Sequence, residues 1–121
     1  MGQIEFDTGS LPSALVARPT GDVDMAVTPA LQAELLAAVG EHGAGCLVVD
    51  LGGVEYIDSS GIELLFRIHE ALTGESVDLI VVAPPGTSAA RLLGMVALDD
   101  IGEIRGSLPE ALQTCGDPEA R

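Results

Sequence analysis

The clearest candidates for chemistry are two adjacent serines that follow an aspartate between a buried strand and an amphipathic helix. They are Ser59 and Ser60, directly behind Asp58, in the segment from Val49 to Ile62. A helix N-terminus offers backbone N–H groups without partners and the positive end of the helix dipole, and both favour a phosphate group. A phosphate would add about −1.5 to −2 charges at pH 7 and so change what the surface can bind. The sequence therefore predicts a switch based on serine phosphorylation.

The residues at the start of this helix indicate which serine is free to react. Ser60 and Glu63 match an S-x-x-E capping box, in which the Ser60 hydroxyl accepts a hydrogen bond from the N–H of Glu63. Ser59 would then lie one residue outside the helix with an exposed hydroxyl, as a protein kinase requires. The alternative interpretation is that both serines are ordinary turn and cap residues.

Two motifs in the chain resemble those of a known protein family. Residues 50–62 read DLGGVEYIDSSGI, and residues 20–24 read TGDVD. The first is similar to the D-L-S-G-V-x-F-I-D-S-S-G-L signature of anti-sigma factor antagonists, the bacterial STAS-domain proteins, and the second to their G-E-[LI]-D turn. The similarity extends loosely over residues 4–115. Gly52 and Tyr56 replace a serine and a phenylalanine of the family pattern, but the position of the phosphorylated serine, directly after the aspartate, is occupied by Ser59.

The resemblance implies a regulatory cycle between protein partners. The unphosphorylated protein would bind an anti-sigma factor, which is itself a serine kinase that carries ATP, and would thereby free a sigma factor. The kinase would phosphorylate Ser59 and release the protein, and a serine phosphatase acting on phospho-Ser59 would restore the active form. The alternative within the same family is a scaffold subunit, of a stressosome-like assembly or of a transport complex, that is never phosphorylated.

Further residues near the serines are candidates for partner binding. The resemblance implies that Asp24 lies beside the phosphorylated serine and engages the anti-sigma factor, although an Asx hydrogen bond that closes a turn is an alternative role. Asp58 either caps the helix or orients the serine. Gly61 either leaves room for a partner backbone or simply permits the turn. We include Asp24, Asp58, Ser60 and Gly61 in the expected partner-binding surface.

The spacing of apolar residues predicts the elements that position this surface. Short runs near the N-terminus, turned near Gly9–Ser10, predict an antiparallel pair of strands, and later strand-length runs alternate with helical periodicity. The expected order is strands near 4–6 and 11–18, a helix from 28 to about 40 that Thr28 caps, a strand at 46–51, a helix from 60 to about 73, a strand at 77–83, a short helix after 87, a weak strand at 101–104 and a helix from 107. This order predicts an α/β domain with a mixed β-sheet packed against helices, and the resemblance implies the STAS fold.

The composition limits the classes of partner. The 121 residues have the length of one domain, with a core over about residues 4–115 and a frayed tail at 116–121. The net charge of −14 would repel nucleic acid and anionic membranes. Aromatic residues make up 2% of the chain, too few for base stacking. The acidity serves either solubility or steering toward a basic partner surface.

The cysteines and the apolar runs bear on the location of the protein. Cys46 and Cys115 stand far apart and form no C-x-x-C pair, and we expect Cys46 to act as a small core residue in a strand. The run at 77–83 is too short to span a bilayer, and the N-terminus lacks a basic stretch followed by an apolar region. We therefore expect a cytoplasmic protein that contacts no membrane, in a compartment that is not oxidising.

The sequence offers little support for catalysis. Ser59 lies outside a G-x-S-x-G motif, and His42 and His69 fall on predicted helices with no geometry for a general base. Two separate histidines also lack the additional ligands of a metal site. A hydrolase that uses Ser59 is the third alternative, and we expect instead a binding protein without enzymatic activity, metal or cofactor.

Overall fold

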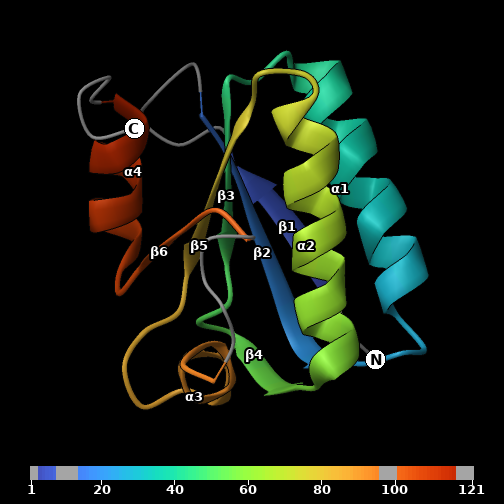
Figure 1. The fold of residues 1–121 in the computed structure, drawn as a ribbon, viewed down its shortest axis with the longest axis vertical. Coiled ribbons are helices and arrows are strands. Elements are labelled where there is room, and N and C mark those ends of the chain that lie inside the picture. Colours follow the sequence, from blue (N-terminus) through green and yellow to red (C-terminus); the bar gives the residue numbers. More distant parts are fainter. Residues whose placement is uncertain (1–2, 8–13, 96–100, 117–121) are drawn as a thin grey trace.

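The structure is a computed structural model that describes residues 3–7, 14–95 and 101–116 (Figure 1). Its strands are β1 (Gln3–Asp7), β2 (Ala14–Val23), β3 (Cys46–Asp50), β4 (Val54–Ile57), β5 (Asp78–Val82) and β6 (Glu103–Arg105). Its helices are α1 (Thr28–His42), α2 (Ser59–Thr73), α3 (Ser88–Leu93) and α4 (Leu108–Gly116). The predicted turn at Gly9–Ser10 and residues 117–121 of the predicted tail lie outside the described residues, whereas Gly116, which was expected in that tail, ends α4.

The described strands form one mixed sheet, as the sequence predicted. The main path runs β1-β2-β3-β5-β6, in which β1 is antiparallel to β2 and the other neighbours are parallel. β4, which the sequence did not predict, lies off this path and pairs in parallel with the last residues of β2, beyond a register shift between Gly21 and Asp22. β2 therefore carries the upstream motif to the strand that leads into α2.

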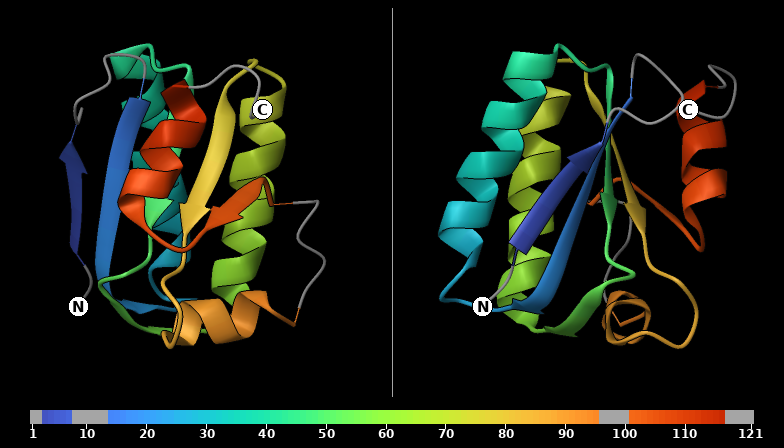
Figure 2. Two further views of the ribbon diagram at one scale, coloured as in Figure 1. Left: turned by 90° about the vertical axis from the view of Figure 1, so that its left-hand side faces the viewer. Right: turned by 180° about the vertical axis from the view of Figure 1, so that it is seen from behind.

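Helices cover both faces of the sheet (Figure 1 and Figure 2). α1 and α2 lie side by side on one face, α4 lies on the other, and α3 crosses the end of the sheet next to β4. Successive side chains of β3 point to opposite faces of the sheet, and both faces are covered. Leu47 and Val49 join the core under α1 and α2, while Cys46 and Val48 join the core under α4. This burial on both faces explains why the sequence of β3 is continuously apolar. The prediction of a central strand buried on both faces is thus confirmed.

Helix α1 begins differently from the prediction. Thr28 is a buried residue inside the helix, and Val27 takes the N-cap position without a side-chain hydrogen bond. The carbonyl of Asp24 accepts hydrogen bonds from the N–H groups of Val27 and Thr28, both at 3.1 Å. The Asp24 carbonyl thus accepts hydrogen bonds from the N–H groups at the start of the helix, so the hydroxyl of Thr28 is not needed as a cap.

The two cysteines form a disulfide bond, which the sequence did not predict. Cys46 opens β3, and Cys115 lies near the end of α4, with 6.0 Å between their Cα atoms. The side chain of Cys46 is buried in the core, as predicted. The pairing left no signal in the sequence because 69 positions separate the residues and only the packing of α4 on the sheet brings them together.

Candidate functional site

The candidate site lies where β4 ends and α2 begins. Asp58 is the N-cap residue of α2, and its backbone is extended, with φ −118° and ψ −170°. Its Oδ1 atom accepts hydrogen bonds from the N–H of Ser60, at 2.9 Å, and from the Ser60 hydroxyl. Aspartate is among the best N-cap residues because its side chain satisfies N–H groups that lack partners within the helix. The helix therefore starts at Ser59, one residue earlier than predicted.

The predicted capping box between Ser60 and Glu63 is wrong. The half-buried Ser60 donates its hydroxyl to Asp58, and Glu63 instead faces Arg67, with 3.6 Å between Oε2 and Nη2. Because α2 begins at Ser59, Ser60 lies inside the first turn and is not the cap residue whose hydroxyl could accept the N–H of Glu63. Of the two roles considered for Asp58, its hydrogen bonds identify that of helix cap.

The same contacts lower the pKa of the Asp58 carboxyl. The hydrogen bond from the Ser60 hydroxyl has the largest effect, desolvation opposes it, and hydrogen bonds from backbone N–H groups at the start of α2 add to the lowering. Asp58 is therefore ionised at neutral pH, and the start of α2 already carries one negative charge.

Ser59 is the exposed residue of the pair, in agreement with the prediction. It is the first residue of α2, and its side chain faces solvent. Within the part of the chain that the structure describes, no group forms a hydrogen bond with its hydroxyl. An exposed and uncommitted hydroxyl of this kind is accessible to another protein.

The pairing of β2 with β4 brings the two sequence motifs together. Val23, the last residue of β2, lies opposite Ile57, the last residue of β4. Asp24 and Asp58 follow these two strand ends directly, so both carboxylates lie at the same end of the molecule as Ser59. Asp24 also makes the Asx hydrogen bond that was considered as an alternative, because its Oδ1 accepts the N–H of Ala26 at 3.0 Å.

Gly61 has an internal role, which corrects its interpretation as a residue that admits a partner backbone. The residue is buried. A Cβ atom at this position would lie 2.5 Å from Cγ1 of Ile57 and 3.2 Å from Cγ1 of Val23. The space beside Gly61 is therefore filled by β4 and β2, and the missing side chain lets α2 approach both strands.

Two exposed apolar side chains near these carboxylates were missed by the sequence reasoning. Met25, directly after Asp24, is 77% exposed, and Tyr56, opposite Asp22 in the strand pairing, is 52% exposed. Tyrosine and methionine are enriched in protein–protein interfaces. A single sequence gives no signal for either, since methionine is most often buried and tyrosine occurs both in cores and on surfaces.

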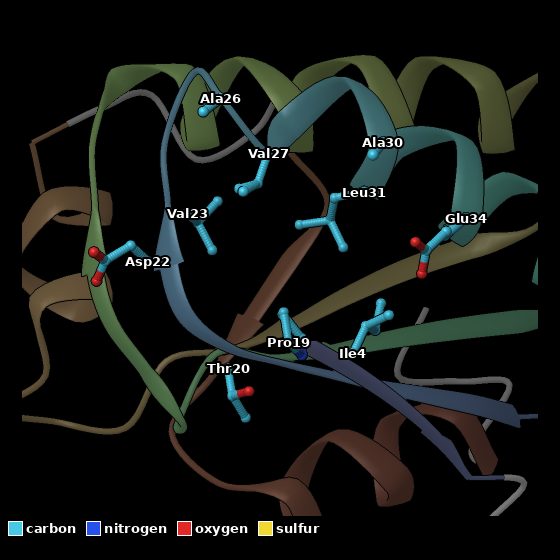
Figure 3. Close-up of a pocket in the computed structure, with 10 residues that line it drawn as sticks. All are labelled: Ile4, Pro19, Thr20, Asp22, Val23, Ala26, Val27, Ala30, Leu31 and Glu34. Atoms are coloured by element: carbon cyan, nitrogen blue, oxygen red, sulfur yellow. The ribbon is translucent and has the colours of Figure 1, made fainter. Parts of the chain in front are cut away.

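A cavity of about 490 Å³ lies between α1 and strands β1 and β2 (Figure 3). The side chains of Ile4, Val27 and Leu31 point toward one another in it, and the carboxylate of Glu34 lies at one end. Its lining includes residues on either side of Asp24 but does not include Ser59. The cavity is thus a neighbour of the candidate site rather than part of it.

The described ranges contain no group of three or more histidine, cysteine, aspartate or glutamate side chains that could hold a metal ion. His42 Nε2 and His69 Nδ1 are buried without a hydrogen-bond partner among the described residues. Within the same ranges, the helices are too short or too polar to cross a lipid bilayer.

Comparisons with known proteins agree with this arrangement. The family model described as STAS domain matches residues 5–111. The chain is 32% identical over 92 residues to the anti-sigma-F factor antagonist RsfB of Mycobacterium tuberculosis, a match that covers 76% of this chain and 73% of RsfB. It is also 32% identical over 82 residues to the probable sulfate transporter 3.4 of Arabidopsis thaliana, a match that covers 60% of this chain and spans only 13% of the transporter.

A solved structure with the same fold is an anti-sigma factor antagonist from Mycobacterium paratuberculosis. Its TM-score is 0.80 at 24% identity, over 97% of this chain and 96% of that one. The fold that the sequence implied, a mixed sheet packed against helices, is therefore confirmed. The family model and the similarity to RsfB show that this chain belongs to the STAS domain family, in the group of the anti-sigma factor antagonists.

Proposed function

We propose that the protein controls a sigma factor by partner switching. The unphosphorylated form binds an anti-sigma factor serine kinase and so frees the sigma factor, and phosphorylation of Ser59 ends the interaction. The observation that carries this proposal is the exposed hydroxyl of Ser59, which bonds to none of the described residues, at the first position of α2 and beside the strand ends that Asp24 and Asp58 follow. Since sigma factors act on transcription, the proposal places the protein in the cytoplasm.

Ser59 acts as a phosphate acceptor in this cycle. Its hydroxyl oxygen attacks the γ-phosphorus of ATP held by the kinase, a phosphorus–oxygen bond to serine forms while the bond to ADP breaks, and the hydroxyl proton passes to a base on the kinase. A serine phosphatase then adds water to phospho-Ser59, which releases inorganic phosphate and restores the hydroxyl. Neither step needs a catalytic group or a cofactor from this chain, so the protein works by binding.

The surroundings of Ser59 favour a strong electrostatic response. The N–H of Ser60 is already bonded to the Asp58 carboxylate, and the N–H of Gly61 donates to the Asp58 carbonyl at 3.0 Å. A phosphate on Ser59 therefore meets fewer unpaired N–H groups than the sequence predicted, and its charge adds to that of Asp58. One acidic group of a docked partner at ~4–8 Å, with an effective dielectric constant of ~20, would cost about 2–4 kcal/mol per unit charge. Binding would weaken about 30- to 1000-fold.

The proposal is tested with the cognate kinase and two variants of Ser59. Ser59→Asp should lose most of its affinity for the kinase in calorimetric titration, because it places a negative charge at the acceptor position. Ser59→Ala should bind as tightly as the unphosphorylated protein and should remain bound in the presence of ATP. Intact-mass measurement after incubation with kinase and ATP should show one added phosphate on the wild type and none on Ser59→Ala.

Ser76→Asp provides a matched control for the added charge. Ser76 is exposed in the turn after α2, at the opposite end of that helix from Ser59, and its φ of 60° is one that aspartate tolerates. This variant should bind the kinase like the wild type. Equal affinities of Ser59→Asp and Ser59→Ala for the kinase would count against the switch.

A second candidate function follows from the similarity to the sulfate transporter of Arabidopsis thaliana. The chain would then be a regulatory or scaffold subunit of a transport complex, or of a stressosome-like assembly, and would need no phosphorylation. Absence of phosphate on Ser59 after exposure to candidate kinases, together with elution as a very large particle in size-exclusion chromatography, would favour this function over the switch.

A further inference from the structure

The disulfide bond is a covalent link between the sheet and the helix on its second face. Cys46 is the first residue of β3, and Cys115 lies near the end of α4. Both side chains are buried, with 1% and 3% of their surface exposed. The bond therefore fixes the C-terminal end of α4 to a central strand of the sheet.

An apolar face of the sheet lies beneath α4. Five strand residues of this face are each at most 1% exposed and share a core cluster with Ala111 and the two cysteines: Ala14, Val16, Val48, Ile80 and Val82. Among the described helices, α4 alone lies over this face (Figure 2). If α4 moved away, this apolar surface would become accessible to water or to another molecule.

Among the described residues, apolar packing and a side-chain hydrogen bond also hold α4 on the sheet. Leu108, Ala111 and Leu112 contribute apolar packing, and Nε of Arg105 donates a hydrogen bond to Oγ1 of Thr114 at 3.0 Å. A helix of nine residues is too short to be stable without contacts to the rest of the fold. We therefore expect that loss of the covalent link loosens α4 before it affects α1 or α2.

The proposed function makes a permanent disulfide unexpected at this place. A protein that acts on a sigma factor works in the cytoplasm, where thiol reductants keep most cysteines reduced and where disulfides are mainly transient, catalytic or redox-sensing. This step of the argument rests on the proposed function, whereas the position of the bond does not. Because both sulfurs are buried, a reductant reaches them when α4 opens locally.

We propose that Cys46 and Cys115 form a reversible redox site, at which a cellular dithiol controls how firmly α4 covers the second face of the sheet. A thiolate of the reductant attacks one sulfur, forms a mixed disulfide and releases the other cysteine, which takes up a proton. The second thiolate of the reductant then displaces the first cysteine, which is also protonated, and the reductant leaves as a disulfide. The protein gains two electrons and two protons. A small disulfide such as oxidised glutathione reverses these steps.

The test compares the oxidised wild-type protein with the same protein after reduction by dithiothreitol under native conditions. Hydrogen exchange at the amides of α4 should become faster by about tenfold or more on reduction, while exchange in α1 and α2 changes less. The midpoint of thermal unfolding should fall by roughly 10 °C, because the bond closes a long loop of the unfolded chain. Alkylation of free thiols followed by intact-mass measurement records the redox state of each sample.

The double variant Cys46→Ala with Cys115→Ala is the control, since dithiothreitol should leave its exchange and unfolding unchanged. Equal exchange of α4 in the oxidised and reduced wild type would overturn the proposal. The proposal would also fail if both cysteines of the reduced protein could still be alkylated after treatment with oxidised glutathione, because the bond would then not re-form. Reduction that occurs only in denaturant would identify a permanent structural bond and would overturn the proposal as well. None of these measurements involves the kinase, so their failure leaves the proposal for Ser59 intact, and a lack of phosphorylation leaves the redox response of α4 measurable.

Discussion

The backbone N–H of Asp58 donates a hydrogen bond to the carbonyl oxygen of Val23, with 3.4 Å between nitrogen and oxygen. This bond extends the parallel pairing of β4 with the end of β2 by one residue. It ties the residue that caps α2 to the residue that precedes Asp24. Two segments that α1 and β3 separate along the chain thereby form one surface, and its geometry depends on how closely α2 packs against both strands.

The first prediction concerns that close packing. In Gly61→Ala, the new Cβ would lie 2.5 Å from Cγ1 and 2.7 Å from Cδ1 of Ile57, so this side chain or the start of α2 must shift. Overpacking of this kind costs about 1–3 kcal/mol, and we expect a corresponding decrease in the free energy of unfolding in urea. The displaced helix start should also weaken binding of the anti-sigma factor kinase.

Two further variants serve as controls for this prediction. Gly40 lies inside α1, and a Cβ there would meet nothing within 4 Å. Gly40→Ala should therefore stabilise the protein by about 1 kcal/mol through helix propensity. Ile57→Ala creates room beside residue 61, so Gly61→Ala should cost less in that background than in the wild type. Additive losses in the double variant would show that Ile57 is not the obstacle.

The lowered pKa of Asp58 predicts a particular dependence of stability on pH. The ordinary pKa of the group is 3.8, and the folded value lies below it. The resulting stability is fully present above the unfolded pKa and is lost as pH falls through the folded pKa. Asp58→Asn keeps an acceptor at the N-cap but lacks the charge. We expect this variant to be less stable than the wild type at neutral pH and the difference to shrink below about pH 4.

Urea unfolding of both proteins over a series of pH values measures this effect. Asp58→Ala, which lacks the acceptor as well as the charge, should be the least stable of the three at neutral pH. A difference between wild type and Asp58→Asn that stays constant down to the most acidic value would contradict the role of the ionised carboxylate.

The contrast between Ser60 and Asp58 shows how far the sequence could predict this molecule. Helical periodicity of apolar residues predicted α1 and α2, and short continuous apolar runs predicted β3 and β5, since burial of one face or of both faces imposes these patterns. The cap residue of α2 could not be predicted, because Asp58 and Ser60 are both good N-cap residues and lie two positions apart. Only the extended backbone of Asp58 places its carboxylate against the N–H and hydroxyl of Ser60.

Features that arise from tertiary contact were beyond the sequence pattern. β4 has four residues, and although Val, Tyr and Ile favour strands, only the first and the last are buried, so its apolar residues do not alternate as in a half-buried strand. The disulfide joins residues that approach each other only when α4 docks on the sheet. The exposure of Met25 follows from its place in the turn before α1, where local sequence does not distinguish a core methionine from a surface one.

The charge of Asp24 is the subject of the next prediction. Its Oδ1 atom accepts the N–H of Ala26, and asparagine retains this acceptor. Asp24→Asn should therefore leave the free energy of unfolding nearly unchanged. Its affinity for the kinase should fall by about three- to tenfold, chiefly through slower association, and the loss should diminish at high salt.

Glu41→Gln is the matched control for Asp24→Asn. Glu41 is exposed near the C-terminal end of α1, and its substitution removes the same charge away from Asp24. Surface plasmon resonance at two salt concentrations compares the variants. A similar loss of association rate in both would indicate that the net charge of the protein, rather than the position of Asp24, governs the encounter.

The last prediction concerns Met25 as an apolar anchor for the kinase. Its side chain is flexible, polarizable and 77% exposed, directly beside Asp24, and such side chains fill pockets of binding partners. Met25→Ala should leave thermal unfolding unchanged, since most of the side chain already lies in water, but it should speed dissociation of the kinase by about tenfold. Met95→Ala, a comparably exposed methionine after α3 at 75%, is the control. If both variants dissociate at the wild-type rate, the contact between the proteins does not include Met25, and the carboxylates and Ser59 must account for the affinity without it.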